Sequence, residues 1–420
     1  MLQRRVLLKR IIVEKDSYYD SVFLMLINRD VKKIQGVKDA VVSMGTEMNI
    51  DLLKEIGLSS PEVEKASAND LIIAVEAESE ETAARACDAA DDLLKKKKST
   101  IENSGEYRPA TLETALNMIA DANLAIISLP GQYAAREARK ALSRGLHVML
   151  FSDNVSLDDE IELKKLAVEK GLLMMGPDCG TAIINGKPLC FANVVRDGDI
   201  GIVAASGTGL QEVFCCIDNL GSGVTQAIGT GGRDLKNIRV DGMMMLLGIE
   251  ALKKDPRTKV IVVISKPPAP EVADKVIAAL KETGKPAVIH FIGLEAKEQR
   301  HNLYFAGNLE EAAGMAVSLS RGEAYKPRVF TIPEEKVREI VAKESAGISS
   351  EQKYLRGLYT GGTLADEAMI LFNREIGEIY SNNQVKPELV PADPHVSQEH
   401  TIVDLGDDVF TVGRPHPQCR

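Results

Sequence analysis

Apolar positions form short runs that alternate with amphipathic stretches over most of the chain. Runs of about four to eight apolar residues predict buried strands, and longer stretches with apolar residues three or four positions apart predict helices. Between residues 123 and 293 the predicted strands are almost continuously apolar, which is typical of strands covered on both faces of a parallel sheet. Strands separated by helices of this length indicate βαβ units. The pattern therefore predicts an α/β protein with several doubly wound parallel-sheet domains, Rossmann-like and flavodoxin-like, in tandem.

The same pattern divides the 420 residues into five blocks. The first two are predicted to be an N-terminal α/β subdomain and a Rossmann-like region, and the third a flavodoxin-like domain. The fourth, polar and charged, is expected to be a linker. The fifth is short for a domain of this class, so it is expected to be the start of a further, truncated α/β domain. In chain order the blocks are residues 1–100, 106–197, 198–325, 326–352 and 353–420.

A lysine run, Lys95–Lys98, closes a strongly helical stretch of the first block. Cations at the carboxyl end of a helix interact favourably with its macrodipole. The run is therefore interpreted as a solvated helix end rather than as a membrane or phosphate patch. The polar residues 99–108 that follow are expected to form a linker.

Charge and composition exclude several classes of function. The formal net charge is −10, Trp is absent, and only 9 Tyr and 9 Phe are present. Neither the basic surface nor the stacking residues of a nucleic-acid-binding protein are therefore expected. No window reaches the ~18 apolar residues of a membrane span, and no export signal is recognisable. The six cysteines form no CxxC pair and have no histidine at zinc spacing, which predicts a reduced, cytoplasmic protein without a metal site.

Four glycine-bearing turns each follow a predicted strand. Ligands of parallel sheets bind beyond the carboxyl ends of the strands, where the following helices begin. The N–H groups at the start of a helix bind phosphates and carboxylates, and Ser or Thr hydroxyls add further donors. The turns are "GPDCGTA" (176–182), "ASGTGLQE" (205–212), "GTGGRD" (229–234) and "YTGGTLADE" (359–367).

Two of these turns supply the candidate phosphate site. Hydroxyl groups and a small backbone mark the turn that opens at Ser206, and two glycines in "GTGGRD" allow the backbone to approach a ligand closely. Arg233, beside those glycines, is a candidate partner for an oxyanion. The candidate phosphate-binding residues are Ser206, Gly207, Thr208, Gly231 and Gly232.

The linked motifs resemble a known family. "GPDCGTAIINGKPLCFANVV", "GDIGIVAASGTGLQE" and "AIGTGGRDL" are similar to the α subunit of succinyl-CoA synthetase and to related NDP-forming acyl-CoA synthetases. "SDNV", "SKPPA", "LYTGGTLADEA" and "VDLGDDVFTVGRPHP" resemble the FdrA family, a divergent branch of that superfamily, more closely. The resemblance covers essentially the whole chain. It implies a CoA-binding-like second block and a succinyl-CoA-synthetase-like third block.

The resemblance also implies an activity. The FdrA family is implicated in carbamoyl transfer to or from oxamate in allantoin-nitrogen catabolism, so phosphate-dependent transfer of a carbamoyl or acyl group, with carbamoyl phosphate as substrate, is expected. By analogy with the synthetases, the chain is expected to work with partner subunits, and ADP or ATP with Mg²⁺ to bind a partner chain. Two alternatives stay open: an acyl-CoA synthetase that binds CoA, and a non-catalytic subunit of such a complex.

Two positions depart from the synthetase pattern. In the synthetases the S-G-T turn binds the phosphate of a phosphohistidine, and the position matching that histidine in "HNLYFAGNLEE" is Phe305, which cannot carry a phosphoryl group. Lys266, in "ISKPPAP", stands where the synthetases have a carboxylate. His301 and His290 are interpreted as a surface loop residue and a strand residue, not as replacements. The resemblance and these departures imply that a phosphate is bound without a covalent intermediate. Lys266 and Arg233 are the candidate catalytic cations.

The "GPDCGTA" turn and a nearby asparagine supply the candidate substrate-binding residues. Asp178 and Asn193 could orient the amide nitrogen of a carbamoyl group or of oxamate. Cys179 is assigned a binding or structural role, because no histidine lies nearby in sequence to activate it as a nucleophile. The full set is Gly176, Pro177, Asp178, Cys179 and Asn193.

CoA binding by this chain is in doubt from the sequence. The synthetases hold the CoA phosphates with a glycine-rich turn after their first strand, whereas the corresponding stretch here, "VEKDSYYDSVFLM", contains no glycine. A CoA pyrophosphate would have to be held differently.

Overall fold

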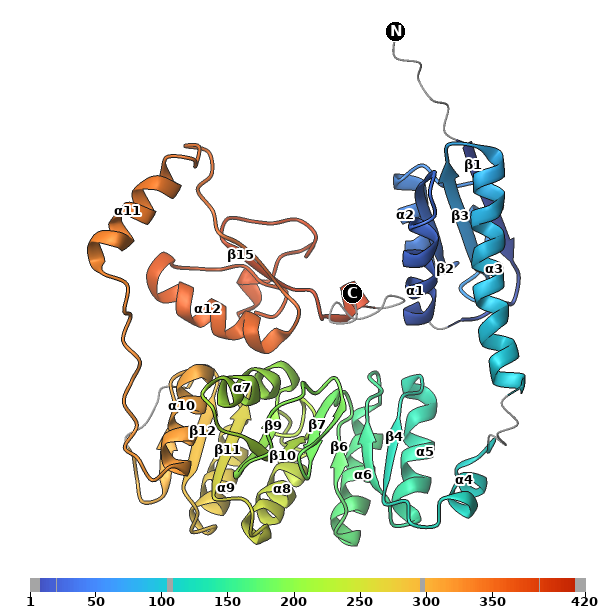
Figure 1. Ribbon diagram of the computed structural model, residues 1–420. Helices are drawn as coiled ribbons and strands as arrows, with labels where there is room; N and C mark the ends of the chain where they lie inside the picture. Colours follow the sequence, from blue (N-terminus) through green and yellow to red (C-terminus); the bar gives the residue numbers. More distant parts are fainter. Residues whose placement is uncertain (1–7, 20, 104–108, 295–298, 385, 412–420) are drawn as a thin grey trace. The chain divides into compact units, whose positions relative to one another are not determined.

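The computed structural model in Figure 1 describes residues 8–19, 21–103, 109–294, 299–384 and 386–411. The chain divides into two compact units. The described residues before Pro109, together with those from Asp408 on, form the first unit, and Pro109–Asp407 form the second. In the part of the chain that the structure describes, no helix is long and apolar enough to cross a membrane.

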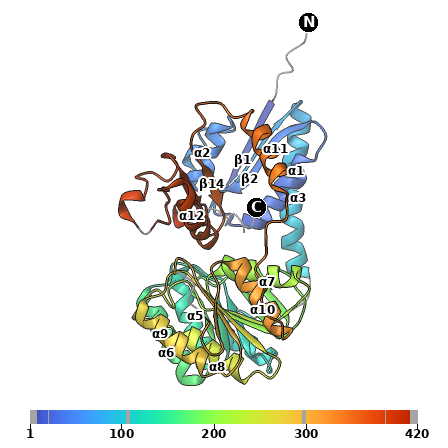
Figure 2. The same cartoon turned by 90° about the vertical axis from the view of Figure 1, so that its left-hand side faces the viewer.

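The first unit is built on a three-stranded sheet with helices on both faces. Its elements are β1 (Leu8–Glu14), α1 (Ser21–Lys32), β2 (Val37–Met44), α2 (Glu47–Glu55), a 3₁₀ helix (Val63–Lys65), β3 (Leu71–Ala77), α3 (Glu80–Asn103) and α13 (Asp408–Thr411). The strand order is β1-β3-β2, and the central strand β3 runs antiparallel to both neighbours. α1 and α3 pack on one face of this sheet and α2 on the other (Figure 2).

The antiparallel pairing corrects the predicted parallel sheet for this unit. Because β3 lies between β1 and β2, the two strands joined by α1 are not neighbours. An alternation of strands and helices predicts such crossovers but does not fix which strands pair. α3 also continues to Asn103, so Lys95–Lys98 do not form its last turn, and the described part of residues 99–108 is helix rather than linker.

The second unit begins with a small parallel sheet. Its elements are α4 (Leu112–Met118), β4 (Leu124–Ile127), α5 (Gly131–Ser143), β5 (His147–Leu150), α6 (Leu157–Lys170) and β6 (Met174–Met175). The three strands lie side by side in chain order and are parallel. Apolar side chains of α5 and α6, among them Leu142 and Leu163, are buried with Val148 and Leu150 of β5. These are the βαβ units that the apolar runs predict.

A seven-stranded sheet follows. Its elements are β7 (Thr181–Ile184), β8 (Lys187–Cys190), β9 (Ile200–Ala205), α7 (Gly207–Asn219), β10 (Val224–Gly229), α8 (Met243–Lys254), β11 (Val260–Ser265), α9 (Pro270–Lys281), β12 (Ala287–Phe291), β13 (Leu303–Phe305) and α10 (Leu309–Ser320). The strand order is β13-β12-β11-β9-β10-β7-β8. The five strands from β13 to β10 are parallel, and the β7–β8 hairpin adds to β10 in the antiparallel sense.

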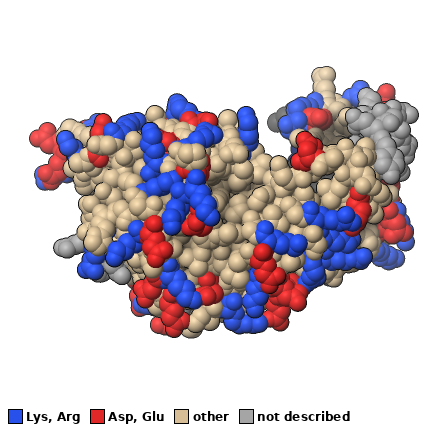
Figure 3. Space-filling model, turned by 90° about the horizontal axis from the view of Figure 1, so that it is seen from below, with Lys and Arg blue, Asp and Glu red and all other residues tan. Residues whose placement is uncertain are grey.

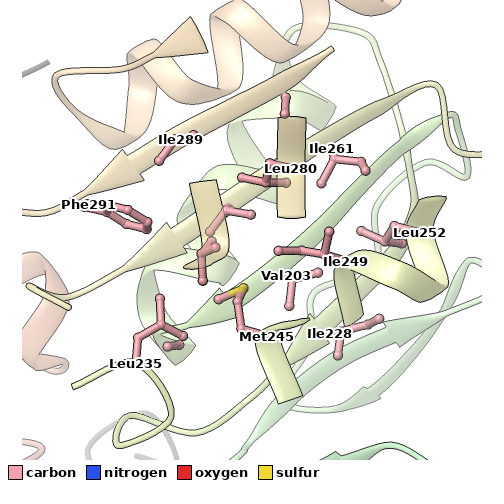
Figure 4. Close-up of a cluster of buried hydrophobic side chains, with 14 of the residues drawn as sticks. Val203, Ile228, Leu235, Met245, Ile249, Leu252, Ile261, Leu280, Ile289 and Phe291 are labelled. Carbon is pink, nitrogen blue, oxygen red and sulfur yellow. The ribbon is translucent and has the colours of Figure 1, made fainter. Parts of the chain in front are cut away.

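Both faces of this sheet are covered, which confirms the doubly wound fold. On one face Val203 and Ile289 pack with side chains of α8 and α9 (Figure 4). On the other face Ile202 and Val262 pack with side chains of α7 and α10. Every residue of β9 and β11 is buried, as continuous apolar runs predict for strands with two covered faces.

Two short pieces of this sheet differ from the prediction. Residues 181–190, grouped by sequence with the preceding Rossmann-like region, join the seven-stranded sheet through the pairing of Ile183 with Ala227. A hairpin has no crossover helix to indicate which sheet it enters, so the apolar pattern cannot assign it. β13 is not predicted at all, because three residues are too few for a periodic pattern.

The second unit ends with a helix and a small two-stranded sheet. Its elements are α11 (Glu334–Ser345), β14 (Arg356–Tyr359), α12 (Gly362–Ile376), a 3₁₀ helix (Pro387–Leu389) and β15 (Thr401–Asp404). α11 lies within the stretch predicted as a linker, and none of its residues is buried, so it lacks an apolar face that the sequence could reveal. β14 and β15 are parallel, and α12 packs against them.

The surface charges are mixed. On the face seen in Figure 3, Lys and Arg side chains are interspersed with Asp and Glu side chains. Ion pairs between different elements of the second unit include Arg139 with Glu162 and Lys275 with Asp241. The face in this view is therefore not uniformly basic.

Candidate anion-binding site

Ser206 joins β9 to α7 at the carboxyl edge of the seven-stranded sheet. Its hydroxyl caps α7 by accepting a hydrogen bond from the Gly209 N–H at 3.1 Å. The same hydroxyl oxygen lies 2.6 Å from that of Thr363, and both residues are buried. Because the first N–H groups of a helix have no partner within it, those of Gly207 and Thr208 could donate hydrogen bonds to an anion.

A second helix begins opposite the first. Gly361 precedes α12 in an extended conformation and has no side chain to cap it. A Cβ on Gly361 would lie 2.3 Å from Thr208 Cγ2. The two turns therefore approach so closely that only glycine fits at position 361. α7 has 13 residues and α12 has 15. Both helices therefore bring the positive end of a macrodipole to the same place.

Lys266 adds a full positive charge beside the start of α12. It follows β11, which lies next to β9 in the sheet. Its Nζ lies 3.4 Å from Asp366 Oδ2, and a Cβ on Gly362 would come within 2.3 Å of the same nitrogen. The ammonium group thus fills the space that a side chain at position 362 would need. Two helix N-termini and a lysine together form a site suited to a phosphate or carboxylate.

Asp366 and Asp404 are acidic neighbours of Lys266 that the sequence does not single out. Asp366 Oδ1 accepts a hydrogen bond from Asn383 Nδ2 at 2.8 Å, and the same amide donates to the Gly362 carbonyl at 3.0 Å. Burial raises the pKa of Asp366 to about 6, Lys266 opposes the rise, and the charge of Asp404 adds to it. This carboxyl is therefore ionised for the most part at pH 7, yet close to its titration range.

α12 also contacts the first turn of α10. Glu367 Oε1 accepts a hydrogen bond from the Leu309 N–H at 2.8 Å. Burial raises the pKa of Glu367, and the hydrogen bond from Leu309 opposes the rise. Thr363 and Glu367 are four residues apart, so they lie on one face of α12. Through this face α12 is held against the starts of both α7 and α10.

Arg233 is engaged in a different contact. Its Nε lies 2.7 Å from Glu160 Oε2, and its Nη2 donates a hydrogen bond to the Val155 carbonyl at 2.8 Å. Glu160 is buried on α6, where its carboxylate needs a cationic partner. Arg233 is thus held in an ion pair with Glu160, and its role as a catalytic oxyanion partner stays a prediction.

Lys164 is the centre of the buried network to which this pair belongs. Its Nζ donates to Glu160 Oε1 at 2.8 Å, to Asp234 Oδ1 at 2.8 Å and to the Thr230 carbonyl at 2.9 Å. Asp234 in turn accepts the N–H of Met245 in the first turn of α8 at 2.8 Å. The network fixes the "GTGGRD" loop to α6 and α8.

The "GTGGRD" loop also packs against the "GPDCGTA" turn. Gly231 has a φ of +87°, and a Cβ there would lie 2.6 Å from the Pro177 carbonyl oxygen. Gly176 has a φ of +106°, and a Cβ there would lie 2.3 Å from the Leu150 carbonyl oxygen. These glycines are required for close contact between backbones. Gly232 is exposed, with open space where its side chain would be, and its ligand contact stays a prediction.

Cys179 faces the core rather than a ligand. Its thiol donates to the Thr181 carbonyl at 3.5 Å and to the Gly229 carbonyl at 3.6 Å. Burial raises the pKa of this thiol to about 12, so it is uncharged at neutral pH. Its predicted substrate contact stays a prediction. Asp178 and Asn193 are exposed, and their substrate-binding roles stay predictions.

The position that matches the family's phosphohistidine is Phe305, at the end of β13 and beside Ile289 of β12. His290 is buried on β12 with its Nδ1 3.0 Å from the Ala306 carbonyl oxygen, and burial lowers its pKa. It is therefore a neutral core residue at pH 7. His301 is exposed in a loop. Both placements agree with the sequence interpretation.

Comparison with known proteins defines the class: the chain is acyl-CoA-synthetase-like and belongs to the CoA-binding ligase superfamily. Family models match three segments: an AllF heavy metal-associated domain over residues 7–109, a CoA binding domain over 195–293 and a CoA-ligase domain over 358–419. YahF of Escherichia coli (strain K12) is 47% identical over 409 residues, which are 97% of this chain and 78% of YahF. The chain belongs to the FdrA family, a divergent branch of the superfamily of succinyl-CoA synthetase α subunits.

Further similarities cover about half of this chain. The succinate–CoA ligase [ADP-forming] subunit alpha 2 of Archaeoglobus fulgidus is 28% identical over 231 residues, 53% of this chain and 77% of that protein. The solved ATP citrate lyase from Methanothrix soehngenii, in complex with citrate and coenzyme A, is similar at a TM-score of 0.43 and 18% identity. The similarity covers 58% of this chain and 47% of that chain, so the match extends over about half of the lyase.

The first family model is named for a heavy metal, but the matched residues of this chain lack a set of metal-binding side chains. Residues 7–109 contain one cysteine, Cys87, and no histidine. Cys87 is buried in α3. Among the residues that the structure describes, no group of three or more His, Cys, Asp or Glu could hold a metal ion. Residues 7–109 therefore do not offer the set of cysteine and histidine ligands that suits a heavy-metal ion.

CoA can be tested against the carboxyl edge of β4, β5 and β6, where a nucleotide would lie against a parallel sheet. The loops at this edge, residues 128–131, 151–156 and 176–180, contain no Lys or Arg, and they expose Asp153 and Asp178. They do not supply cations to offset the phosphates of CoA. The glycine-free "VEKDSYYDSVFLM" stretch has no bearing on this point, because β1 belongs to the antiparallel sheet of the first unit.

Proposed function

We propose that this chain binds the phosphate group of carbamoyl phosphate, or of a related acyl phosphate, between the starts of α7 and α12. It transfers the carbamoyl or acyl group to an acceptor such as oxamate without forming a phosphohistidine. The observation that carries the proposal is that two helix N-termini meet beside Lys266. The Lys266 Nζ lies 3.4 Å from Asp366 Oδ2. A phosphate with two negative charges is the ligand whose charge best complements three such positive groups.

The transfer step follows from the chemistry of a mixed anhydride. A nitrogen of the acceptor attacks the carbonyl carbon, a C–N bond forms, and the bond from that carbon to the bridging oxygen breaks. The electron pair of the broken bond leaves with the phosphate, and the proton lost by the acceptor nitrogen ends on that phosphate, which departs as hydrogen phosphate. The N–H groups of Gly207 and Thr208, together with Lys266, stabilise the charge that grows on the departing phosphate. Phe305 cannot accept a phosphoryl group, so the transfer is direct.

Partner subunits belong to the same proposal. The relatives include proteins named as α subunits of ADP-forming ligases. A nucleotide, ADP or ATP with Mg²⁺, would then bind a partner chain and receive or supply the phosphate.

An acyl-CoA ligase is the second candidate function. The match of a CoA binding domain model to residues 195–293 favours it. The loops at the edge of β4, β5 and β6 supply no cation for CoA, although the matched residues lie in the seven-stranded sheet. The two functions differ in the ligand that stabilises the protein.

Ligand-dependent thermal unfolding of the full chain separates these candidates. Carbamoyl phosphate in large excess over its dissociation constant is expected to raise the melting temperature by a few degrees, and CoA is expected not to, because only a ligand that binds the folded state shifts unfolding. Oxamate and ADP with Mg²⁺ complete the panel. A shift with CoA alone would contradict carbamoyl transfer and favour the acyl-CoA ligase.

A matched pair of variants at Gly207 locates the binding. A Cβ at this exposed position meets nothing within 4 Å, and aspartate in the first turn of a helix is favourable to the fold. Gly207→Asp is expected to abolish the shift by carbamoyl phosphate, since its carboxylate repels the phosphate. Gly207→Asn, of the same size but neutral, is expected to keep most of it. Equal shifts in the two variants would place the ligand elsewhere.

A further inference from the structure

The ion pair between Lys266 and Asp366 carries an inference that rests on the proposed function and deepens it. The exposed fraction of the Lys266 side chain is 28% and that of Asp366 is 15%, so the pair is shielded from water on most sides. It lies at the start of α12, where the proposed phosphate is bound. A phosphate that contacts Lys266 therefore competes with Asp366 for the same ammonium group.

Charged groups face Asp366 from three other segments. Burial is the largest influence and raises its pKa; Lys266, after β11, lowers it, Asp404 at the end of β15 raises it, and Lys236, after β10, lowers it. Asn383, which is neutral, donates a hydrogen bond to the second carboxylate oxygen. The outcome is a pKa of about 6 even with two lysines nearby, so the carboxylate becomes the minor of its two forms below about pH 6.

An incoming phosphate changes this balance in one direction. Its negative charges repel the carboxylate and attract Lys266, which is the group that favours the ionised form of Asp366. Both effects disfavour the charged carboxyl. A proton on Asp366 removes the repulsion and leaves the Lys266 ammonium to the phosphate, while the O–H of the neutral acid becomes a hydrogen-bond donor.

We propose that a phosphate-bearing ligand displaces Asp366 from Lys266, and that Asp366 takes up a proton from solvent as the ligand binds. The site exchanges an internal Lys–Asp pair for a Lys–phosphate pair. Affinity for the phosphate dianion therefore rises as the pH falls from about 8 toward 6, where the free carboxyl becomes protonated on its own and the coupling ends.

Isothermal titration of the full chain with inorganic phosphate at pH 7, in buffers of different ionisation enthalpy, measures the proton uptake. The wild type is expected to take up about half a proton more per phosphate than Asp366→Asn, corresponding to about a threefold steeper change of affinity per pH unit. The titration of phosphate itself is common to both proteins and cancels in the comparison. Glu367→Gln is the matched control, because it removes the neighbouring buried carboxylate of α12, which contacts Leu309 rather than Lys266.

Each outcome decides the inference. Extra uptake in the wild type and in Glu367→Gln, absent from Asp366→Asn, supports it. Equal uptake in wild type and Asp366→Asn, or a loss in Glu367→Gln as well, overturns it and leaves the proposed function intact. If the wild type binds no phosphate, the proposed function fails, and the inference fails with it. If Asp366→Asn does not fold, proton uptake by the wild type with sulfate, whose charge is fixed in this pH range, decides: uptake supports the inference and none overturns it.

Discussion

Replacing Lys164 with methionine is expected to lower the free energy of unfolding of the second unit by about 3–5 kcal/mol, because it removes one partner of a buried ion pair. The Lys164 side chain is 0% exposed, and its Nζ contacts both Glu160 and Asp234, which are buried as well. Methionine fills a similar volume but leaves two carboxylates in the interior without their shared cation. It also removes the donor to the Thr230 carbonyl, so the ion pair of Arg233 with Glu160 is the remaining polar contact described here between the "GTGGRD" loop and α6.

Urea unfolding followed by circular dichroism measures this effect. Lys165→Met is the control, since Lys165 is the next residue on α6 and is exposed; the same substitution there is expected to change stability by about 0.5 kcal/mol or less. Similar losses in the two variants would mean that the network around Lys164 contributes little to the stability of the unit.

Replacing Lys266 with glutamine is expected to weaken the binding of inorganic phosphate by about ten- to hundredfold. A hydrogen bond to a charged group contributes about 1.5–3 kcal/mol, and about 1.4 kcal/mol corresponds to a factor of ten in affinity. The helix N-termini are unchanged in this variant, so residual binding is expected. The loss is measured by equilibrium dialysis at low salt, where charge interactions are least screened.

Lys259→Gln is the matched control for this variant. Lys259 precedes β11 and is paired with Asp199, and its side chain is 68% exposed. Lys259→Gln therefore removes one positive charge, as Lys266→Gln does, but at the opposite end of β11. If both variants lost affinity equally, net charge rather than a defined site would account for phosphate binding.

The doubly wound part of the fold can be predicted from the sequence because its signals are local. β9 and β11 are uninterrupted apolar runs, and each is followed by a turn and an amphipathic helix. Strand pairing in the first unit is not a local property. The sequence shows where β1, β2 and β3 lie, but the insertion of β3 between the other two depends on contacts between distant residues.

The candidate site shows the same division. The turn at Ser206 can be recognised because the strand, the glycines and the helix are contiguous. Its contact with Thr363 spans 157 positions of the chain, so the sequence offers four separate turns without showing that two of them meet. Asp366 lies inside the "YTGGTLADE" turn, one helical turn after Gly362, and this spacing is the one signal that could have indicated it.

Arg233 illustrates why the charge of a residue does not establish its role. From the sequence it is a cation beside two glycines, which is a reasonable oxyanion partner. Its partner Glu160 lies 73 positions earlier on a helix whose sequence pattern suggests an acidic, solvated start. Only the packing of α6 against the loop shows that Glu160 is buried and forms an ion pair with Arg233.

The central claim is that a phosphate binds where α7 and α12 meet, and a crystal structure of the protein grown with inorganic phosphate tests it most directly. We predict a phosphate that accepts hydrogen bonds from the N–H groups of Gly207 and Thr208 and contacts Lys266 Nζ. A phosphate bound only at another place, or contacts at this edge that leave Lys266 out, would contradict the claim.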